Sequence, residues 1–149
     1  MSGRGASRVR AGHPWVYRSD LLRAAGEAGD VVRVEDRRGR FLGYAFYNPR
    51  SEIALRVAER REGVGIDGAW FGSRLRAALE YRAGLGIDGD AYRLLHAEAD
   101  GVPGLVADVY GEHVVLQVGS AAVERRLELV VRALAELLSP AGVLLRGDA

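Results

Sequence analysis

The sequence predicts an α+β protein of two modules, a small β-barrel in residues 1–66 followed by a small α/β domain in residues 67–149. Short runs of β-branched and aromatic residues between turn residues fill the first part. In the second part, apolar residues at helical spacing alternate with strand-like runs. A polar stretch at residues 59–65 separates the two parts, and 149 residues suffice for two small domains.

Three strands and one short helix are expected in the first module. The strands cover residues 31–35, 40–46 and 53–58. The turn residues at 36–39 join the first two strands. The helix is expected from Pro14 to Leu22, because proline suits the first turn of a helix.

The second module is expected to begin with a helix that Asp67 caps and Gly84 ends. Strands are expected at residues 91–96, 105–110, 113–118 and 142–146. Gly111-Glu112 lies between the second and third of these, and a glycine-first pair is typical of a tight hairpin turn.

A second helix is expected after the hairpin, with Ser120 as its N-cap and Ser139-Pro140 at its end. Its apolar stripe consists of Val123, Leu127, Val130, Val131, Leu134, Leu137 and Leu138. The strand at residues 142–146 is expected to be buried, and such a strand normally continues into more sheet. We therefore expect a truncated chain. The alternative is that this strand pairs with the hairpin and closes the fold.

The composition excludes several classes of protein. The chain contains no cysteine, so it cannot hold a disulfide, a thiolate zinc site, an iron–sulfur cluster or a cysteine nucleophile. No apolar run approaches the roughly 18 residues that cross a bilayer. The basic N-terminus also lacks the apolar segment of a signal peptide. We expect a cytoplasmic protein without a membrane partner.

Charge is divided unevenly between the two modules. Residues 1–66 contain 13 arginines and 8 acidic residues, whereas residues 67–149 contain 8 arginines and 12 acidic residues. A basic first module indicates an anionic partner, although an excess of this size also falls within ordinary scatter. All 21 basic residues are arginine. A coding bias explains the lack of lysine better than function does.

A glycine pattern typical of dinucleotide-binding loops occurs twice. G-x-G-x-x-G spans residues 63–68, before the first helix of the second module, and residues 84–89, after it. The motif needs a buried strand before it and a helix behind it. The first copy follows a polar stretch and the second follows a helix, so neither predicts a nucleotide site.

Side chains that bind metals or move protons gather in residues 93–111. His96 and Glu98 match the H-x-E of zinc deaminases, but the Cys-x-x-Cys that completes that site is absent. A site for another metal could use His96, Glu98, Asp100 and Asp108, and Glu98 with Asp108 could form the carboxylate pair of a glycoside hydrolase. The alternative is an ordered acidic turn, because Asp-Gly and Pro-Gly turn dipeptides occur in the same stretch.

Aromatic and cationic residues alternate near the N-terminus. The stretch GHPWVYR at residues 12–18 follows Arg8 and Arg10 closely. Aromatic rings stack on bases and arginines bind phosphates, so this pattern favours nucleic-acid binding. The alternative is that Trp15 and Tyr17 pack the short helix on the barrel, and this is what we expect of Trp15. Arg8, Arg10 and Arg18 are better candidates for phosphate contact.

Three longer segments follow one another in a recognisable order and spacing. They are GHPWVYRSDLL, GDVVRVEDRRGRFLGYAFYNPRSEIALRV and AYRLLHAEADGVPGLVADVYGEHVVLQV. Together they resemble the N-terminal part of a bacterial methyltransferase family that makes 5-methylcytosine in 23S ribosomal RNA with S-adenosylmethionine. The resemblance covers essentially all 149 residues. Ala97 and Val102 stand where the family commonly has glycine and leucine.

The resemblance implies a PUA domain in residues 1–66, a middle α/β domain in residues 67–149, and a Rossmann-like catalytic domain that is absent here. The family's catalytic cysteine adds to C6 of cytosine and makes C5 nucleophilic. Because this chain has neither that cysteine nor the domain that binds S-adenosylmethionine, we expect no catalytic residue, metal or cofactor on it.

The resemblance also implies that the chain holds 23S ribosomal RNA for the absent methyltransferase domain. The arginines expected to contact phosphate are Arg4, Arg8, Arg10, Arg18, Arg50 and Arg56, and further contacts are expected from His13, Tyr47 and Asn48. The loop residues Glu98, Asp100, Gly101 and Pro103 are expected to face the catalytic domain or its RNA.

Two other functions stay open from the sequence. One is a small metal or acid–base enzyme that uses Glu98, Asp100 and Asp108. The other is a structural module, including one that forms a homodimer.

Overall fold

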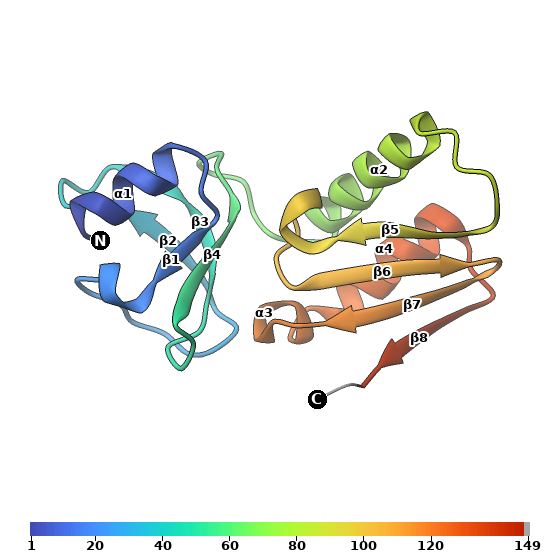
Figure 1. Ribbon diagram of the computed structural model, residues 1–149. Helices are drawn as coiled ribbons and strands as arrows, with labels where there is room; N and C mark the ends of the chain where they lie inside the picture. The colour runs from blue at the N-terminus through green and yellow to red at the C-terminus, as the bar shows by residue number, and fades with distance from the viewer. Residues whose placement is uncertain (148–149) are drawn as a thin grey trace. The chain divides into compact units, whose positions relative to one another are not determined.

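The computed structural model describes residues 1–147, which form two compact units (Figure 1). The first unit is Met1–Val64, and the second begins at Gly65, two residues before the boundary that the sequence predicts. Each unit has its own sheet of four strands. The α+β class expected from the sequence is confirmed.

The first unit is an antiparallel sheet with one α-helix (Figure 1). Its elements are α1 (Gly3–Arg10), β1 (Trp15–Tyr17), the 3-10 helix η1 (Arg18–Asp20), β2 (Val31–Glu35), β3 (Phe41–Tyr47) and β4 (Ile53–Glu59). Ala6 and Val9 of α1 are buried in the same core as Val16, Ala45 and Leu55 of the sheet. The three predicted strands are therefore confirmed, each within one residue of its expected bounds.

The sheet of the first unit is open. Its strand order is β1-β4-β3-β2, so within residues 1–147 the edge strands β1 and β2 do not pair with each other. Closing a barrel requires every strand to pair on both sides, and β1 has only three residues. The expected barrel is thus, in the described chain, a four-stranded antiparallel sheet.

The helix expected from Pro14 to Leu22 is wrong. Those residues form β1 and η1 instead, because β1 pairs with β4 and the Pro14 carbonyl accepts the N–H of Val57 at 2.7 Å. The helix of this unit is α1, which lies N-terminal to Pro14. Tertiary pairing with β4 therefore overrides the local signal that proline gives.

The second unit places two long helices on one face of its sheet (Figure 1). Its elements are α2 (Gly68–Gly84), β5 (Ala91–His96), the 3-10 helix η2 (Ala97–Asp100), β6 (Leu105–Tyr110), β7 (His113–Val118), α3 (Ala121–Glu124), α4 (Leu127–Leu138) and β8 (Gly142–Arg146). The strand order is β5-β6-β7-β8, antiparallel except for the parallel pair β7–β8. Phe71, Leu75, Leu105, Leu116 and Leu134 are fully buried between helices and sheet.

The predicted helix caps of the second unit are confirmed. The Asp67 side chain accepts the N–H of Trp70 at 2.9 Å, and the Ser120 hydroxyl accepts the N–H of Val123 at 3.3 Å. The single helix expected after Ser120 is, however, two helices that break at Arg125–Arg126. The Arg126 side chain donates to the carbonyl of Ala122 at 3.0 Å across this break.

The last strand, β8, lies where the sequence predicts it but is not buried in the described chain. It pairs with β7 and is the edge of the sheet, so nothing in residues 1–147 pairs along its other side. Leu144 and Leu145 point to opposite faces and are each more than half exposed. The apolar run predicted the strand correctly, and its edge position explains the exposure.

An ion pair fixes the loop that follows β5. Arg82 of α2 donates to both carboxylate oxygens of Asp100, at 2.6 and 2.8 Å, and both side chains are nearly buried, at 13% and 12% exposed. The N–H of His96 also donates to Asp100, at 2.6 Å. Burial raises the pKa of Asp100, but the hydrogen bonds from Arg82 and His96 outweigh burial and lower it from its usual value.

Asp100→Asn is expected to lower the free energy of unfolding at pH 7 by about 1–3 kcal/mol, because Arg82 would stay charged without its counter-ion. Since folding lowers the pKa of Asp100, the stabilisation is complete above the unfolded-state pKa of about 4. It is lost as pH falls through the folded-state pKa. In urea unfolding, the difference between wild type and Asp100→Asn should be constant from pH 7 to about 5 and shrink below about 4.

Asp108→Asn is the matched control for this experiment. Arg93 also binds Asp108 through two hydrogen bonds, at 2.8 and 3.2 Å, but these side chains are 45% and 23% exposed. Water screens such a pair, so its loss should cost less than about 1 kcal/mol. Equal losses for the two variants would contradict the structural role of the buried pair.

Ala97→Gly is expected to stabilise the protein. Ala97 begins η2 with a φ of 45°, the left-handed region that costs a side chain about 1 kcal/mol and glycine little. A rise of roughly 0.5–1 kcal/mol in the free energy of unfolding is therefore expected. Ala99→Gly is the control, because Ala99 lies in the same 3-10 helix without a positive φ and should lose stability. If both variants have a lower free energy of unfolding than the wild type, Ala97 is not strained.

Candidate nucleic-acid interface

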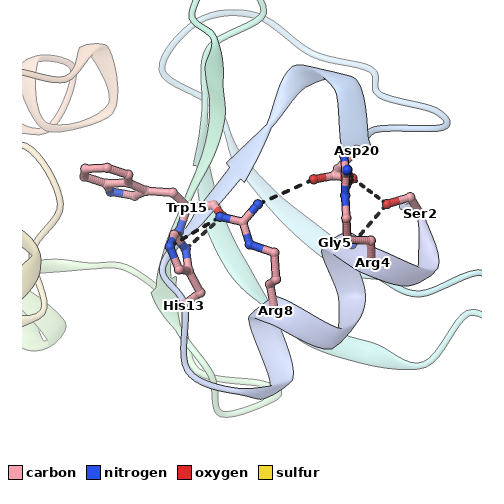
Figure 2. Close-up of polar contacts among 7 residues, drawn as sticks. All are labelled: Ser2, Arg4, Gly5, Arg8, His13, Trp15 and Asp20. Carbon is pink, nitrogen blue, oxygen red and sulfur yellow. Dashed lines mark hydrogen bonds and ion pairs between the residues drawn. The ribbon is translucent and has the colours of Figure 1, made fainter.

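Asp20 joins the start of α1 to the residues that follow β1 (Figure 2). Ser2 is the N-cap of α1, and its hydroxyl accepts the N–H of Gly5 at 3.0 Å while donating to the Asp20 carboxylate at 2.7 Å. The helix approaches Asp20 so closely that a Cβ on Gly5 would lie 3.0 Å from the Asp20 Cβ. A larger residue at position 5 would therefore crowd Asp20.

The buried Asp20 carboxylate also binds two arginines of α1. Arg4 donates to Oδ1 through Nε and a terminal nitrogen, at 3.3 and 3.2 Å, and Arg8 lies 3.9 Å from Oδ2. The hydrogen bond from Ser2 is the largest cause that lowers the pKa of Asp20; burial opposes it, and the two arginines add to it. Asp20 is therefore charged at neutral pH, and the group carries a net charge of one positive unit.

Arg8 reaches from this carboxylate toward the start of β1. Its guanidinium lies 5.1 Å from the centre of the Tyr17 ring, and a terminal nitrogen lies 3.4 Å from Nε2 of His13. The N–H of Trp15 donates to Nδ1 of His13 at 3.2 Å, which holds the imidazole beside the strand (Figure 2). Arg8 is consequently fixed by three neighbours while its side chain remains about one third exposed, at 35%.

Trp15 extends away from α1 and is half-buried (Figure 2). It pairs with Arg56 across β1 and β4, and the Arg56 guanidinium lies 5.5 Å from the centre of its ring. The expectation that Trp15 only packs a helix on the sheet is therefore wrong: the helix it was to hold is absent. Its ring lies beside His13, at 6.2 Å between ring centres.

We call these residues the α1–β1 cluster: Arg4, Arg8, His13, Trp15, Tyr17 and Arg56. The cluster combines guanidinium groups with aromatic rings at one corner of the first unit. Guanidiniums bind phosphates, and aromatic rings stack on unpaired bases. The structure thus brings together four of the nine residues expected to contact RNA, namely Arg4, Arg8, His13 and Arg56.

Two more of the expected arginines lie elsewhere and have carboxylate partners. Arg18 pairs with Glu52, so its charge is locally balanced. Arg10, the last residue of α1, pairs with Asp36 at the turn between β2 and β3.

The remaining expected contacts belong to the end of β3 and the turn behind it. Tyr47 is buried in the core of the first unit, where its ring cannot stack on a base. The Asn48 side chain accepts the N–H of Arg50 at 3.0 Å and so shapes the turn before β4. Arg50 is exposed.

The acidic loop of the second unit is held by hydrogen bonds of its own. Gly101 donates to the carbonyl of Glu98 at 3.1 Å, and Pro103 is buried. Asp100 and Asp108 each bind a different arginine. Residues 1–147 contain no group of three side chains placed to hold a metal ion, so the expected donors do not assemble there.

Sequence reasoning missed two groups of residues. Asp20 gives no local signal, because its partners lie 12 to 18 positions away. The turn Asp36-Arg37-Arg38-Gly39-Arg40 does give one, since three of its five residues are arginine. Its turn residues predict only a connection between two strands. Within residues 1–147, no helix is long and apolar enough to cross a membrane.

Known proteins resemble both units of the chain. The PUA-like domain family matches residues 1–60, which lie within the first unit. A ribosomal RNA large subunit methyltransferase of Deinococcus radiodurans is 42% identical in an alignment of 133 residues that covers 81% of this chain and 33% of the relative. Ribosomal RNA large subunit methyltransferase I of Klebsiella pneumoniae is 36% identical over 98% of this chain and 37% of the relative.

Solved structures show the same fold. A protein of Streptococcus mutans described as a SAM-dependent methyltransferase superimposes with a TM-score of 0.85 at 16% identity, over 98% of this chain and 40% of that protein. The chain thus spans between about a third and two fifths of the length of the proteins it matches. It corresponds to the N-terminal region, a PUA-like domain followed by a middle domain, of the large-subunit ribosomal RNA methyltransferase family.

Proposed function

We propose that the chain binds 23S ribosomal RNA through its PUA-like unit and positions it, in the cytoplasm, for a methyltransferase domain that makes 5-methylcytosine. S-adenosylmethionine and the cysteine nucleophile would belong to that domain, because this chain contains no cysteine. Its own residues would bind and orient RNA.

The names of the relatives support the substrate class. Curated relatives that match 81% and 98% of the chain are ribosomal RNA large subunit methyltransferases. Because the chain spans only part of them, their reaction is part of the proposal. The PUA-like match coincides with the basic module, which has 13 arginines against 8 acidic residues.

The observation that carries the proposal is the α1–β1 cluster. Arg4 and Arg8 share one buried carboxylate, so their side chains are ordered before a ligand arrives while the group keeps a positive charge. Ordered side chains lose less entropy on binding, which favours affinity. Trp15, which lies beside His13, adds a surface for a base.

The metal or acid–base enzyme is the less supported function. Asp100 and Asp108 are each neutralised by an arginine, which lowers their affinity for a cation. No observation favours it over RNA binding.

RNA binding is tested by filter binding of the 149-residue chain to a 23S ribosomal RNA hairpin at salt concentrations from about 50 to 200 mM. Each phosphate contact releases counter-ions, so the logarithm of the affinity should fall linearly with the logarithm of the salt concentration. Arg8→Gln should weaken binding for all hairpins and reduce the slope by about 1. Asp20 keeps its bonds from Ser2 and Arg4 in this variant, so the fold should survive.

Arg132→Gln is the matched control. Arg132 is an exposed arginine of α4 that pairs with Glu128 at 2.7 Å, and its loss changes net charge by the same amount. Its slope should equal that of the wild type. A wild-type affinity that ignores salt contradicts the proposed function, whereas an Arg8→Gln slope equal to the wild type removes only Arg8 from the interface.

A further inference from the structure

Four arginines belong to or reach the turn between β2 and β3, and two of them bind its aspartate, Asp36. Arg37, Arg38 and Arg40 lie in the turn, and Arg10 reaches the same carboxylate from the end of α1. We call Arg10, Asp36, Arg37, Arg38 and Arg40 the β2–β3 turn cluster. Four cations and one anion give it a net charge of three positive units.

Asp36 holds the turn and two of the arginines together. Its Oδ1 accepts hydrogen bonds from the backbone N–H groups of Arg38 and Arg40, at 2.8 and 3.0 Å. Its Oδ2 accepts hydrogen bonds from the side-chain Nε of Arg40, at 2.7 Å, and from a terminal nitrogen of Arg10. The carboxylate is only 5% exposed. Burial raises the pKa of Asp36, but the hydrogen bonds from Arg40 and Arg38 lower it well below its usual range.

The turn has a conformation that needs only Asp36 and a glycine. Asp36 and Arg40 bond through their backbones at 3.0 Å, and Gly39 has a φ of 73°, which glycine adopts without strain. The side chains of Arg37 and Arg38 take no part in this geometry. Their presence therefore calls for an explanation other than the stability of the turn.

Arg37 and Arg38 are both exposed, and within residues 1–147 their guanidiniums form no ion pair or hydrogen bond. The nearest acidic neighbour along β2, Glu35, is already bonded to Arg33 at 2.7 Å. Three arginines within five residues carry like charges, whose repulsion costs stability until an anion binds. Arg10 and Arg40, fixed by Asp36, keep further N–H groups for that anion.

We propose that the β2–β3 turn cluster is a second phosphate-binding site of the first unit and takes the phosphodiester backbone of RNA. This inference rests on the proposed function, because the RNA supplies the ligand. Guanidinium forks match phosphate oxygens in pairs, which favours a phosphate over a single carboxylate. The cluster contains no aromatic ring, so it would contact the backbone without reading bases.

The test compares the full chain with Arg37→Gln/Arg38→Gln in filter binding to the same 23S hairpin over the same salt range. Both side chains are exposed and unbonded, so the melting temperature should not change. The variant should bind all hairpins at least tenfold more weakly, and its salt slope should be smaller by about 1.5–2. Arg37→Lys/Arg38→Lys keeps the charge but loses the planar guanidinium. It should therefore keep the salt slope of the wild type and bind RNA more weakly than the wild type does.

Arg76→Gln/Arg132→Gln is the matched control, because it removes two exposed arginines from the second unit. Its slope should equal that of the wild type. If the wild type itself binds no RNA, the proposed function fails. If the wild type binds and Arg37→Gln/Arg38→Gln has an unchanged slope, this inference fails and the proposed function stands. Binding to polyglutamate is measured for the same proteins. If Arg37→Gln/Arg38→Gln loses polyglutamate binding but binds RNA as the wild type does, the phosphate site is overturned in favour of a site for an acidic protein partner.

Discussion

A carboxylate stays charged inside a protein only if cations or N–H groups surround it, and three aspartates of this chain meet that constraint with arginine. Asp20 joins the end of η1 to α1, Asp36 joins the β2–β3 turn to the last residue of α1, and Asp100 joins the loop after β5 to α2. In each case the guanidinium comes from a segment distant in sequence. These pairs therefore hold tertiary structure as well as local shape.

The number of arginines around each aspartate separates structural pairs from candidate binding sites. Asp100 has one buried arginine, which leaves the pair neutral. Asp20 has two, and Asp36 has two bonded arginines with two more in the same turn. A neutral pair offers little to an anion, whereas an excess of guanidiniums attracts one. The aspartate inside such a group also keeps its arginines ordered, so it does not simply oppose binding.

The sequence predicted the second unit more fully than the first because its signals are local. Asp67 and Ser120 cap their helices through residues three positions away, and the strands at 91–96, 105–110 and 113–118 have the expected bounds. The helix α1 escaped prediction because its sequence, GRGASRVR, contains two glycines and few apolar residues. Its stability depends on Asp20, which lies ten residues beyond its end.

The sequence predicts that the first unit binds an anion, but it does not predict which of its arginines make the contact. A net charge of five positive units in residues 1–66 indicates an anionic partner wherever those charges lie. Tertiary pairing decides which arginines remain available: Glu52 balances Arg18, whereas the β2–β3 turn cluster has one aspartate for four arginines. Three of the five excess charges thus gather in this cluster. Because phosphate attraction depends on local potential and not on total charge, that concentration makes the β2–β3 turn cluster a candidate phosphate site that the total charge of the unit does not locate.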